Sequence, residues 1–286
     1  RLGEADLMLA GGTESMSMVP MLDHKIAMTP AAFSDGNVAI AYGMGITAET
    51  VAERWKVSRA DQDAFALASH RKALAAIAAG EFADEIVPYT LADHYPDLAA
   101  RAIRDDSRTI STDEGPRKDS TLEGLARLKP VFRLDGSVTA GNSSQMSDGA
   151  GALLLASGHA LKAYGLSPIA RFVGFAVAGV PPEIMGIGPI AAIPKALEQS
   201  GIGRDQLDWI ELNEAFAAQS LAVIRDLGLD AGKVNPLGGA IALGHPLGAT
   251  GAIRAATLIH GLRRRKQKYG MVTMCIGTGM GAAGIF

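Results

Sequence analysis

The chain has 286 residues, of which 48% are hydrophobic and 20% are charged, and its formal net charge is −3. These values are typical of a globular protein with one large or two ordinary domains. The small net charge excludes a general attraction to nucleic acid or to anionic membranes, and we expect neither as a partner. The single cysteine excludes an internal disulfide and a thiolate metal cluster. No apolar run reaches the ~18 residues that a membrane span requires.

The first residues already lead into a predicted strand. The chain begins with RLGEAD rather than with Met, and residues 7–12 (LMLAGG) have the pattern of a buried strand that enters a turn. No signal-peptide or transit-peptide pattern precedes this strand. Because a chain rarely starts so close to a core strand, we expect the natural sequence to continue upstream.

Residues 16–145 are polar and irregular apart from one clear helix. Ser58 is its expected N-cap, Asp61 lies at the third helical position, and Gly80 is its expected stop. Residues 91–118 are rich in Asp, Arg, Ser and Pro, which indicates surface loops. The apolar face of the helix is expected to consist of Ala64, Leu67, Leu74 and Ile77.

From residue 146 onward, predicted strands and helices alternate. Short apolar runs predict strands, and longer segments with helical spacing predict helices. The predicted strands are residues 152–156, 171–177, 207–212, 269–275 and 282–286. The predicted helices are residues 189–199, 214–227 and 247–266. This order favours a layered α/β domain in which the last two strands form a hairpin within a mixed sheet.

His245 lies in a glycine-rich loop, GGAIALGHPLGATG (238–251), just before a predicted helix. Glycines let a ligand approach the backbone closely, and the helix dipole should lower the histidine pKa and favour neutral imidazole. A histidine that only caps a turn explains this loop equally well. The other five histidines form no metal-ligand spacing and are expected at the surface: His24, His70, His94, His159 and His260.

Cys275 ends a predicted apolar strand and is followed by the glycine-rich run IGTGMG (276–281). A free cysteine in this position is most often a small buried hydrophobe. However, exposed amides at Gly277 and Gly279 could form an oxyanion hole or support a thiolate. Asn213 follows a predicted strand and opens a helix, so it is either an N-cap or a group that holds a water or an imidazole beside a reacting carbonyl.

Two further segments offer groups that could bind a ligand. Residues 138–150 (VTAGNSSQMSDGA) form either a simple turn or a binding loop that presents hydroxyls and amides. Arg117 is either a surface arginine or a contact for a phosphate or a base. The basic run at residues 263–266 ends a helix and is better explained by the helix dipole than by nucleic-acid binding.

Taken together, these motifs resemble the thiolase family over essentially the whole chain. They are GGTESMS (11–17), TAGNSS (139–144), NEAF (213–216), GHP (244–246) and CIGTG (275–279), in the family's order. The segments MGIGP (185–189) and MCIGTGMG (274–281) are most similar to degradative 3-ketoacyl-CoA thiolases.

The resemblance implies a layered thiolase-like α/β fold with mixed sheets between helices, an incomplete N-terminal half and an inserted loop domain. Residues 1–15 and 146–165 would be the remnant of the N-terminal domain. Residues 16–145 would be the loop domain, which covers CoA and helps to build the oligomer. Residues 166–286 would be the C-terminal domain.

The resemblance also implies roles for individual residues. Cys275 would be the acid/base cysteine that protonates the departing acetyl-CoA enolate and later deprotonates CoA. His245 would activate the nucleophile and direct a ring nitrogen at the thioester oxygen. Asn213 would fix the water of a first oxyanion hole, and Gly277 would supply an amide to a second.

Arg117 and Ser144 fall where the family contacts CoA, which would be a co-substrate; no tightly bound cofactor and no metal are expected. The implied assembly is a homodimer or a homotetramer, with a β-oxidation subunit as a further partner. We expect a bacterial cytoplasmic location, while an organelle stays open because a targeting segment would lie upstream.

The family's nucleophilic cysteine has no counterpart in these residues, because Cys275 is the only cysteine. We expect the nucleophile upstream, in a segment of roughly a hundred residues, and no thiolysis by the 286 residues alone. The half-core left exposed would lower solubility or require a partner chain. Two alternatives remain: an acetoacetyl-CoA thiolase that condenses two acetyl-CoA, and a truncated non-catalytic module that binds CoA or oligomerises.

Overall fold

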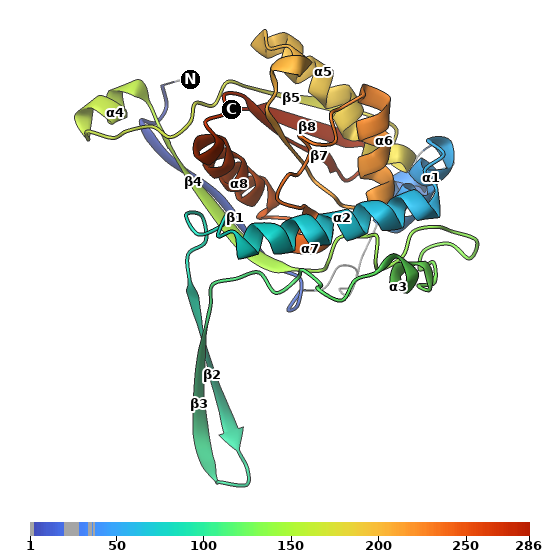
Figure 1. Ribbon diagram of the computed structural model, residues 1–286, viewed down its shortest axis with the longest axis horizontal. Helices are drawn as coiled ribbons and strands as arrows, with labels where there is room; N and C mark the ends of the chain where they lie inside the picture. The colour runs from blue at the N-terminus through green and yellow to red at the C-terminus, as the bar shows by residue number, and fades with distance from the viewer. Residues whose placement is uncertain (1–2, 20–28, 34–35, 37) are drawn as a thin grey trace.

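The computed structural model describes residues 3–19, 29–33, 36 and 38–286. A four-stranded mixed sheet lies at the centre of the described structure (Figure 1). Its strand order is β5 (Gly174–Gly179), β8 (Met280–Ile285), β7 (Gly270–Ile276) and β6 (Trp209–Leu212). The pairs β5–β8 and β8–β7 are antiparallel and β7–β6 is parallel, which confirms the predicted terminal hairpin and mixed sheet.

Both faces of this sheet are covered by helices, and strand β6 shows how the sequence achieves this. Leu212 joins the hydrophobic cluster under α5 (Gly188–Ser200) and α6 (Ala217–Leu227). Trp209 joins the cluster under α8 (Thr250–Arg265) on the other face. Successive strand residues point to opposite faces, so this short strand is buried on both sides. The predicted layered α/β architecture is therefore confirmed.

A second, two-stranded sheet packs on the far side of α8. Strands β1 (Leu7–Ser15) and β4 (Asp148–Ala156) pair antiparallel, and both contact α8. The prediction that β1 is a buried strand is wrong, because none of its residues is buried and the neighbouring Met8 and Leu9 are 54% and 72% exposed. Leu154, the partner of Leu9 on β4, is 65% exposed.

Helix α2 (Arg59–Ala78) confirms the predicted helix and its ends. Ser58 caps it by accepting the Asp61 N–H at 3.1 Å, and Gly80 follows it with φ +70°. The predicted apolar face is only partly right, because Ala64 is exposed and the most buried positions are polar or small. These positions are Gln62, Asp63, Ala66, Leu67, Ser69, His70, Ala73 and Ala76. Its buried polar side chains bond to loop residues, as Asp63 does to Asn142 and Ser69 to Glu214, so the helix does not bury a simple apolar stripe.

The segment predicted as surface loops contains a long β-hairpin. Strands β2 (Tyr89–Asp97) and β3 (Ala102–Ile110) pair antiparallel and project away from the rest of the molecule (Figure 1). Most of their side chains are exposed, so the sequence lacks the alternating apolar face that identifies a strand. The hairpin end uses an Asp97 side chain that accepts the N–H groups of Ala99 and Ala100.

The remaining elements connect these layers. The predicted helices 214–227 and 247–266 begin three residues late, at Ala217 and Thr250, and the predicted strand 171–177 begins at Gly174. No helix in the described part of the chain is long and apolar enough to cross a membrane. The shorter helices are η1 (Pro30–Phe33), η2 (Val38–Ala41), α1 (Met44–Arg54), α3 (Leu122–Ala126), α4 (Gly158–Ala163), η3 (Pro182–Ile187), η4 (Arg204–Gln206) and α7 (Ala240–Leu243).

Candidate active site

The candidate residues Asn213 and Cys275 meet at the carboxyl edge of the parallel strands β6 and β7. Asn213 directly follows β6, and its backbone N–H donates to the Thr273 carbonyl at 2.9 Å, two residues before Cys275. The start of α8 reaches the same place, since a Cβ built on Gly251 would lie 4.0 Å from Cε of Met274. Ligands commonly bind outside the carboxyl ends of strands in open α/β sheets.

Asn213 contacts the catalytic histidine candidate directly. Its Nδ2 lies 3.3 Å from Nε2 of His245, and the asparagine is only 1% exposed. The Oδ1 atom is buried and makes no hydrogen bond within the described part of the chain. The interpretation of Asn213 as an N-cap is wrong, because α6 begins at Ala217 and Phe216 precedes it as the N-cap.

The orientation of the His245 ring is set by Thr250, which the sequence did not single out. Nδ1 lies 2.7 Å from Oγ1 of Thr250, and that hydroxyl donates to the Pro246 carbonyl at 2.9 Å. A carbonyl only accepts, so the threonine hydroxyl proton points to Pro246. The Thr250 oxygen therefore accepts the hydrogen bond from Nδ1–H, and the lone pair lies on Nε2, where it accepts from Asn213 Nδ2.

His245 is neutral at physiological pH. Its burial, and then the positive charge of Arg254, lower its pKa from 6.5 to about 4. The sequence predicted the direction of this shift but attributed it to the helix dipole. Arg254 is itself 3% exposed and lies 3.4 Å from Glu211, which also accepts the indole N–H of Trp209 at 2.6 Å.

The same face of α8 contacts a second carboxyl, that of the half-buried Glu85. Thr257 donates to Glu85 Oε1 at 3.0 Å. Burial raises the Glu85 pKa from 4.5 to about 7, and the Thr257 hydrogen bond and the Arg254 charge oppose that shift. Glu85 Oε2 and Arg254 Nε are both buried and find no partner among the described residues.

Cys275 is held as a thiol. It keeps an intermediate exposed surface, but the protein around its sulfur raises its pKa from 9.0 to about 12. The hypothesis that the following amides hold a resting thiolate is therefore wrong. A group with this pKa enters a reaction carrying its proton.

The turn after Cys275 combines one tightly packed glycine and one open glycine. Gly279 has φ +101°, and a Cβ there would lie 2.3 Å from the Val180 carbonyl, so a side chain cannot be accommodated. A Cβ on Gly277 would meet nothing within 4 Å. The Gly277 backbone thus borders open space beside Cys275, as an oxyanion site requires.

Ser144 is joined to the Asn213 segment through the backbone. Its N–H donates to the Ala215 carbonyl at 2.9 Å, and the Asn142 carbonyl accepts the Ala217 N–H at 2.9 Å. The loop that carries Ser144 is held at its start by Glu49, which is 1% exposed. The Glu49 carboxylate accepts the backbone N–H groups of residues 137 and 138 at 2.9 Å.

Arg117 has an exposed side chain, and only its backbone is anchored. Its N–H donates to Nδ1 of His70 at 3.2 Å. His70 is 4% exposed, so its predicted surface position is wrong; the loop of Arg117 covers it. Its burial, and then the charge of Arg117, lower the His70 pKa. His94 and His159 are exposed as predicted, His260 is half-buried, and His24 lies outside the described residues.

The sequence matches two family models that together cover nearly the whole chain. "Thiolase, N-terminal domain" matches residues 1–159, and "Thiolase, C-terminal domain" matches residues 166–286.

The chain belongs to the thiolase family.

Named relatives within the family are close in sequence. The 3-ketoacyl-CoA thiolase of Bacillus subtilis (strain 168) is 50% identical over 291 residues, which cover all of this chain and 72% of that protein. The acetyl-CoA acetyltransferase of Pseudomonas aeruginosa is 48% identical over 294 residues, which cover 99% of this chain and 72% of that protein.

Solved thiolase structures have the same fold. Human mitochondrial 3-ketoacyl-CoA thiolase in complex with CoA has a TM-score of 0.85 and 43% identity, covering 99% of this chain and 71% of that one. The dimeric peroxisomal thiolase of Saccharomyces cerevisiae has a TM-score of 0.86 and 44% identity, covering 99% of this chain and 69% of that one.

Behind the thiolase motifs lies a buried carboxyl that sequence reasoning passed over. Glu214 is 2% exposed and accepts hydrogen bonds from Ser69 Oγ at 2.6 Å, Asn235 Nδ2 at 2.8 Å and the Ile241 N–H at 3.2 Å. A Cβ on Gly239 would lie 2.1 Å from its carboxyl carbon. Glu214 therefore joins the Asn213 loop to the segment that leads to His245. Its place beside Asn213 in the NEAF motif was the only sequence signal.

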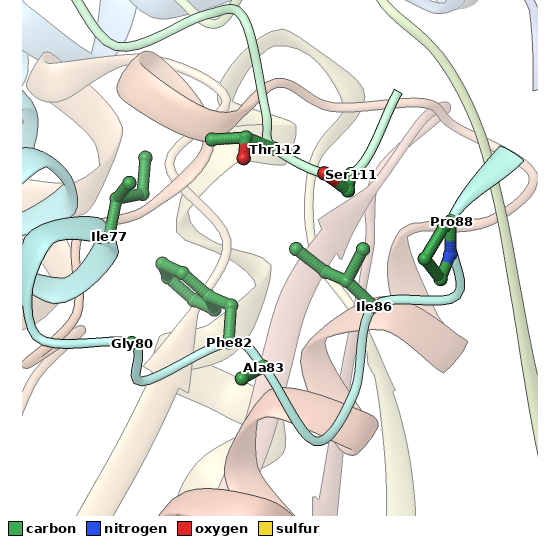
Figure 2. A pocket seen from close by; sticks show the side chains of 8 residues that line it. All are labelled: Ile77, Gly80, Phe82, Ala83, Ile86, Pro88, Ser111 and Thr112. Atoms are coloured by element: carbon green, nitrogen blue, oxygen red, sulfur yellow. The ribbon is translucent and has the colours of Figure 1, made fainter. Parts of the chain in front are cut away.

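One surface pocket lies away from this thiolase site. It has a volume of about 290 Å³ and lies at the base of the β2–β3 hairpin, where Phe82 and Ile86 face Ser111 and Thr112 (Figure 2). None of the candidate catalytic residues lines it. We assign the chemistry to the Asn213–His245 site because titratable groups with shifted pKa converge there. Among the described residues, no group of three or more His, Cys, Asp or Glu is arranged to hold a metal ion.

Proposed function

We propose that this protein is an acetyl-CoA C-acyltransferase that cleaves 3-ketoacyl-CoA with CoA, giving acetyl-CoA and a shortened acyl-CoA, as fatty-acid β-oxidation requires. The observation that carries the proposal is the contact of neutral His245 with Asn213, at the sheet edge where Cys275 keeps its proton. A base and an acid with widely separated pKa values are what this chemistry needs.

In the first half-reaction, a cysteine thiolate attacks the 3-keto carbon and the C2–C3 bond breaks. The electron pair stays on C2, and Cys275 gives its thiol proton to that carbon, releasing acetyl-CoA. In the second, the Cys275 thiolate takes the thiol proton of CoA. The CoA sulfur then attacks the acyl thioester and releases the enzyme thiolate. The raised pKa of Cys275 supports this order, because the residue begins as an acid.

His245 acts first as a base and then as a hydrogen-bond donor. The lone pair on Nε2 takes the proton of the nucleophilic thiol, and the resulting N–H can then donate to the thioester oxygen. Asn213 Oδ1 is a buried acceptor for the water of this first oxyanion hole. The Gly277 amide borders open space and is assigned to the second.

The proposal needs a second thiol. Cys275 is the only cysteine of the 286 residues and already takes the acid/base role, so the nucleophilic cysteine is assigned to an upstream segment. We expect the 286 residues alone to bind CoA without thiolysis. The side chains of Leu9 on β1 and Leu154 on β4 are exposed, which supports the proposal that further protein covers this pair of strands.

CoA is the proposed co-substrate, with Arg117 and Ser144 as its contacts and residues 16–145 as the loop domain over it. The CoA complex of the human mitochondrial relative supports CoA as the co-substrate. We also propose residues 1–15 with 146–165 as the remnant of the N-terminal domain, and residues 166–286 as the C-terminal domain.

A homodimer is supported by the dimeric yeast relative. The proposal also includes a homotetramer as the alternative assembly and a β-oxidation subunit as a further partner. A bacterial cytoplasmic location is also proposed, and the relatives named as peroxisomal thiolases keep an organelle as the alternative.

Two measurements separate this function from its alternatives. In protein that carries both cysteines, labelled acetyl-CoA should leave a covalent acyl group; its absence would favour a non-catalytic CoA-binding module. A chain-length profile should show thiolysis of substrates longer than four carbons. A strict preference for the four-carbon substrate would instead favour an acetoacetyl-CoA thiolase. This alternative is supported by the name of the Pseudomonas relative, an acetyl-CoA acetyltransferase.

A further inference from the structure

The Gln145 side chain connects two loops that are far apart in sequence. Its Nε2 lies 3.0 Å from each of three carbonyl oxygens, those of Gly115, Ile241 and Ala242. Gly115 lies two residues before Arg117, and Ala242 lies three residues before His245. One amide group therefore spans the segment proposed to contact CoA and the segment that holds the catalytic imidazole.

The two segments are in close backbone contact beside Gln145. A Cβ on Gly115 would lie 2.4 Å from the Ala242 carbonyl and 2.9 Å from Gln145 Oε1. This approach requires glycine, and it brings two acceptor carbonyls together at one donor. Without a shared donor, these carbonyls would lose their hydrogen bonds with Gln145 and face one another.

The contact continues along the chain on both sides of Gln145. A Cβ on Gly244 would lie 2.2 Å from Oγ of Ser147, whose hydroxyl donates to the Gln145 carbonyl at 3.1 Å. A Cβ on Gly149 would lie 2.7 Å from Pro246 Cγ. Residues 145–149 thus lie alongside residues 242–246, next to His245.

We propose that Gln145 is a positioning residue that couples the loop of Arg117 to the segment that carries His245. CoA binding and imidazole placement then change together. The coupling rests on the proposed function, because it takes the Arg117 loop as a CoA contact. An amide suits the task because its NH₂ group only donates, whereas a carboxylate would repel the three carbonyls and an apolar side chain would leave them unpaired.

The test compares Gln145→Leu with Gln206→Leu in protein that carries both cysteines. Gln206 is an exposed glutamine whose Oε1 accepts the Gly203 N–H at 2.8 Å. It is a matched control because this hydrogen bond involves none of the proposed site residues. Calorimetry with CoA gives the dissociation constant, and ¹⁵N NMR gives the His245 ring resonances, assigned with His245→Gln. We expect Gln145→Leu to weaken CoA binding about tenfold and to shift the His245 resonances. Gln206→Leu should change neither.

Each result decides the proposal. Unchanged His245 resonances in Gln145→Leu overturn the coupling, whether or not CoA binding weakens. Shifted resonances with unchanged CoA affinity also overturn it, because the CoA loop would then be independent. If the unsubstituted chain does not bind CoA, the proposed function fails, and the His245 shift alone decides whether Gln145 positions the ring. If Gln145→Leu does not fold by circular dichroism, Gln145→Met, which also lacks the donor, takes its place.

Discussion

Nδ1 of His245 lies 2.7 Å from Oγ1 of Thr250, and this contact determines which ring nitrogen carries the lone pair. The threonine hydroxyl proton is committed to the Pro246 carbonyl, so the imidazole proton resides on Nδ1. The base of the proposed reaction therefore depends on a residue five positions along the chain that never needs to touch substrate.

Replacing this acceptor should disturb the histidine without changing its size. Thr250→Val is expected to lower thiolysis about tenfold or more in protein that carries both cysteines, because Nδ1–H is left buried without an acceptor. The His245 ¹⁵N resonances should show loss of the Nδ1–H form. Thr250→Ser keeps the hydroxyl and should retain both properties. Equal activity of the Val and Ser variants would contradict this account.

Cys275→Ser separates the two half-reactions. A serine hydroxyl is a far weaker acid than the thiol, so proton donation to the enolate carbon should fail and turnover should drop at least ~100-fold. Covalent acylation by acetyl-CoA should persist, because the upstream thiol performs it. Mass spectrometry of the acylated protein checks the second statement, and loss of acylation together with turnover would assign the nucleophile's role to Cys275 itself.

Glu85 predicts a pH-dependent stability difference. Its pKa is about 7 in the folded protein and 4.5 in the unfolded chain. Between these pH values the carboxyl is protonated in the folded state and ionised in the unfolded state. Its stabilising contribution is present below pH ~4.5 and is lost as pH rises through about 7. Glu85→Gln removes the ionisation and keeps an acceptor for Thr257. The variant should be more stable than the parent at pH 8, by ~2 kcal/mol, with little difference near pH 4.5.

Urea unfolding at both pH values measures this difference. Glu123→Gln is the control, since Glu123 is exposed in the first turn of α3 and should show no such crossover. A Glu85→Gln variant that is less stable than the parent at pH 8 would mean that the carboxylate, not the neutral acid, fits this site.

Glu214 should matter for stability more than its position in a motif suggests. Glu214→Ala leaves donors from Ser69, Asn235 and Ile241 without their acceptor, at an expected loss of ~3 kcal/mol in the free energy of unfolding. Glu214→Gln keeps one acceptor oxygen and should lose less than half as much. Chemical unfolding at pH 7 distinguishes the two, and equal losses would show that side-chain size rather than hydrogen bonding is responsible.

Local sequence signals predicted the framework of the site well. Glycines after α5 and α6 adopt the left-handed conformation expected of helix stops, and Ser58 caps α2 as its spacing indicates. The ordered motifs selected Asn213 and His245, which the structure brings to 3.3 Å, and Cys275 at the same sheet edge. These features depend on neighbours within a few residues or on motif order, and a single sequence contains both.

The supporting residues depend on contacts between distant segments, and no periodicity reveals those. Gln145 bonds to carbonyls 30 and 97 residues away, and Ser69 reaches Glu214 across 145 residues. The buried polar side chains of α2 were missed for the same reason, since Asp63 and Ser69 bond to Asn142 and Glu214 in distant loops. The β2–β3 hairpin was missed because its exposed strands carry no apolar alternation.

Three residues on helix α8 serve three different partners from one side of the helix. Thr250 holds the imidazole of His245, Arg254 lies beside Glu211, and Thr257 binds Glu85. Their spacing of four and three residues keeps them in register only while the helix length between them is unchanged. One inserted residue would rotate everything after it by ~100° and would separate Arg254 and Thr257 from their partners together. Evolution of this segment should therefore permit substitutions on its outer side far more readily than insertions or deletions.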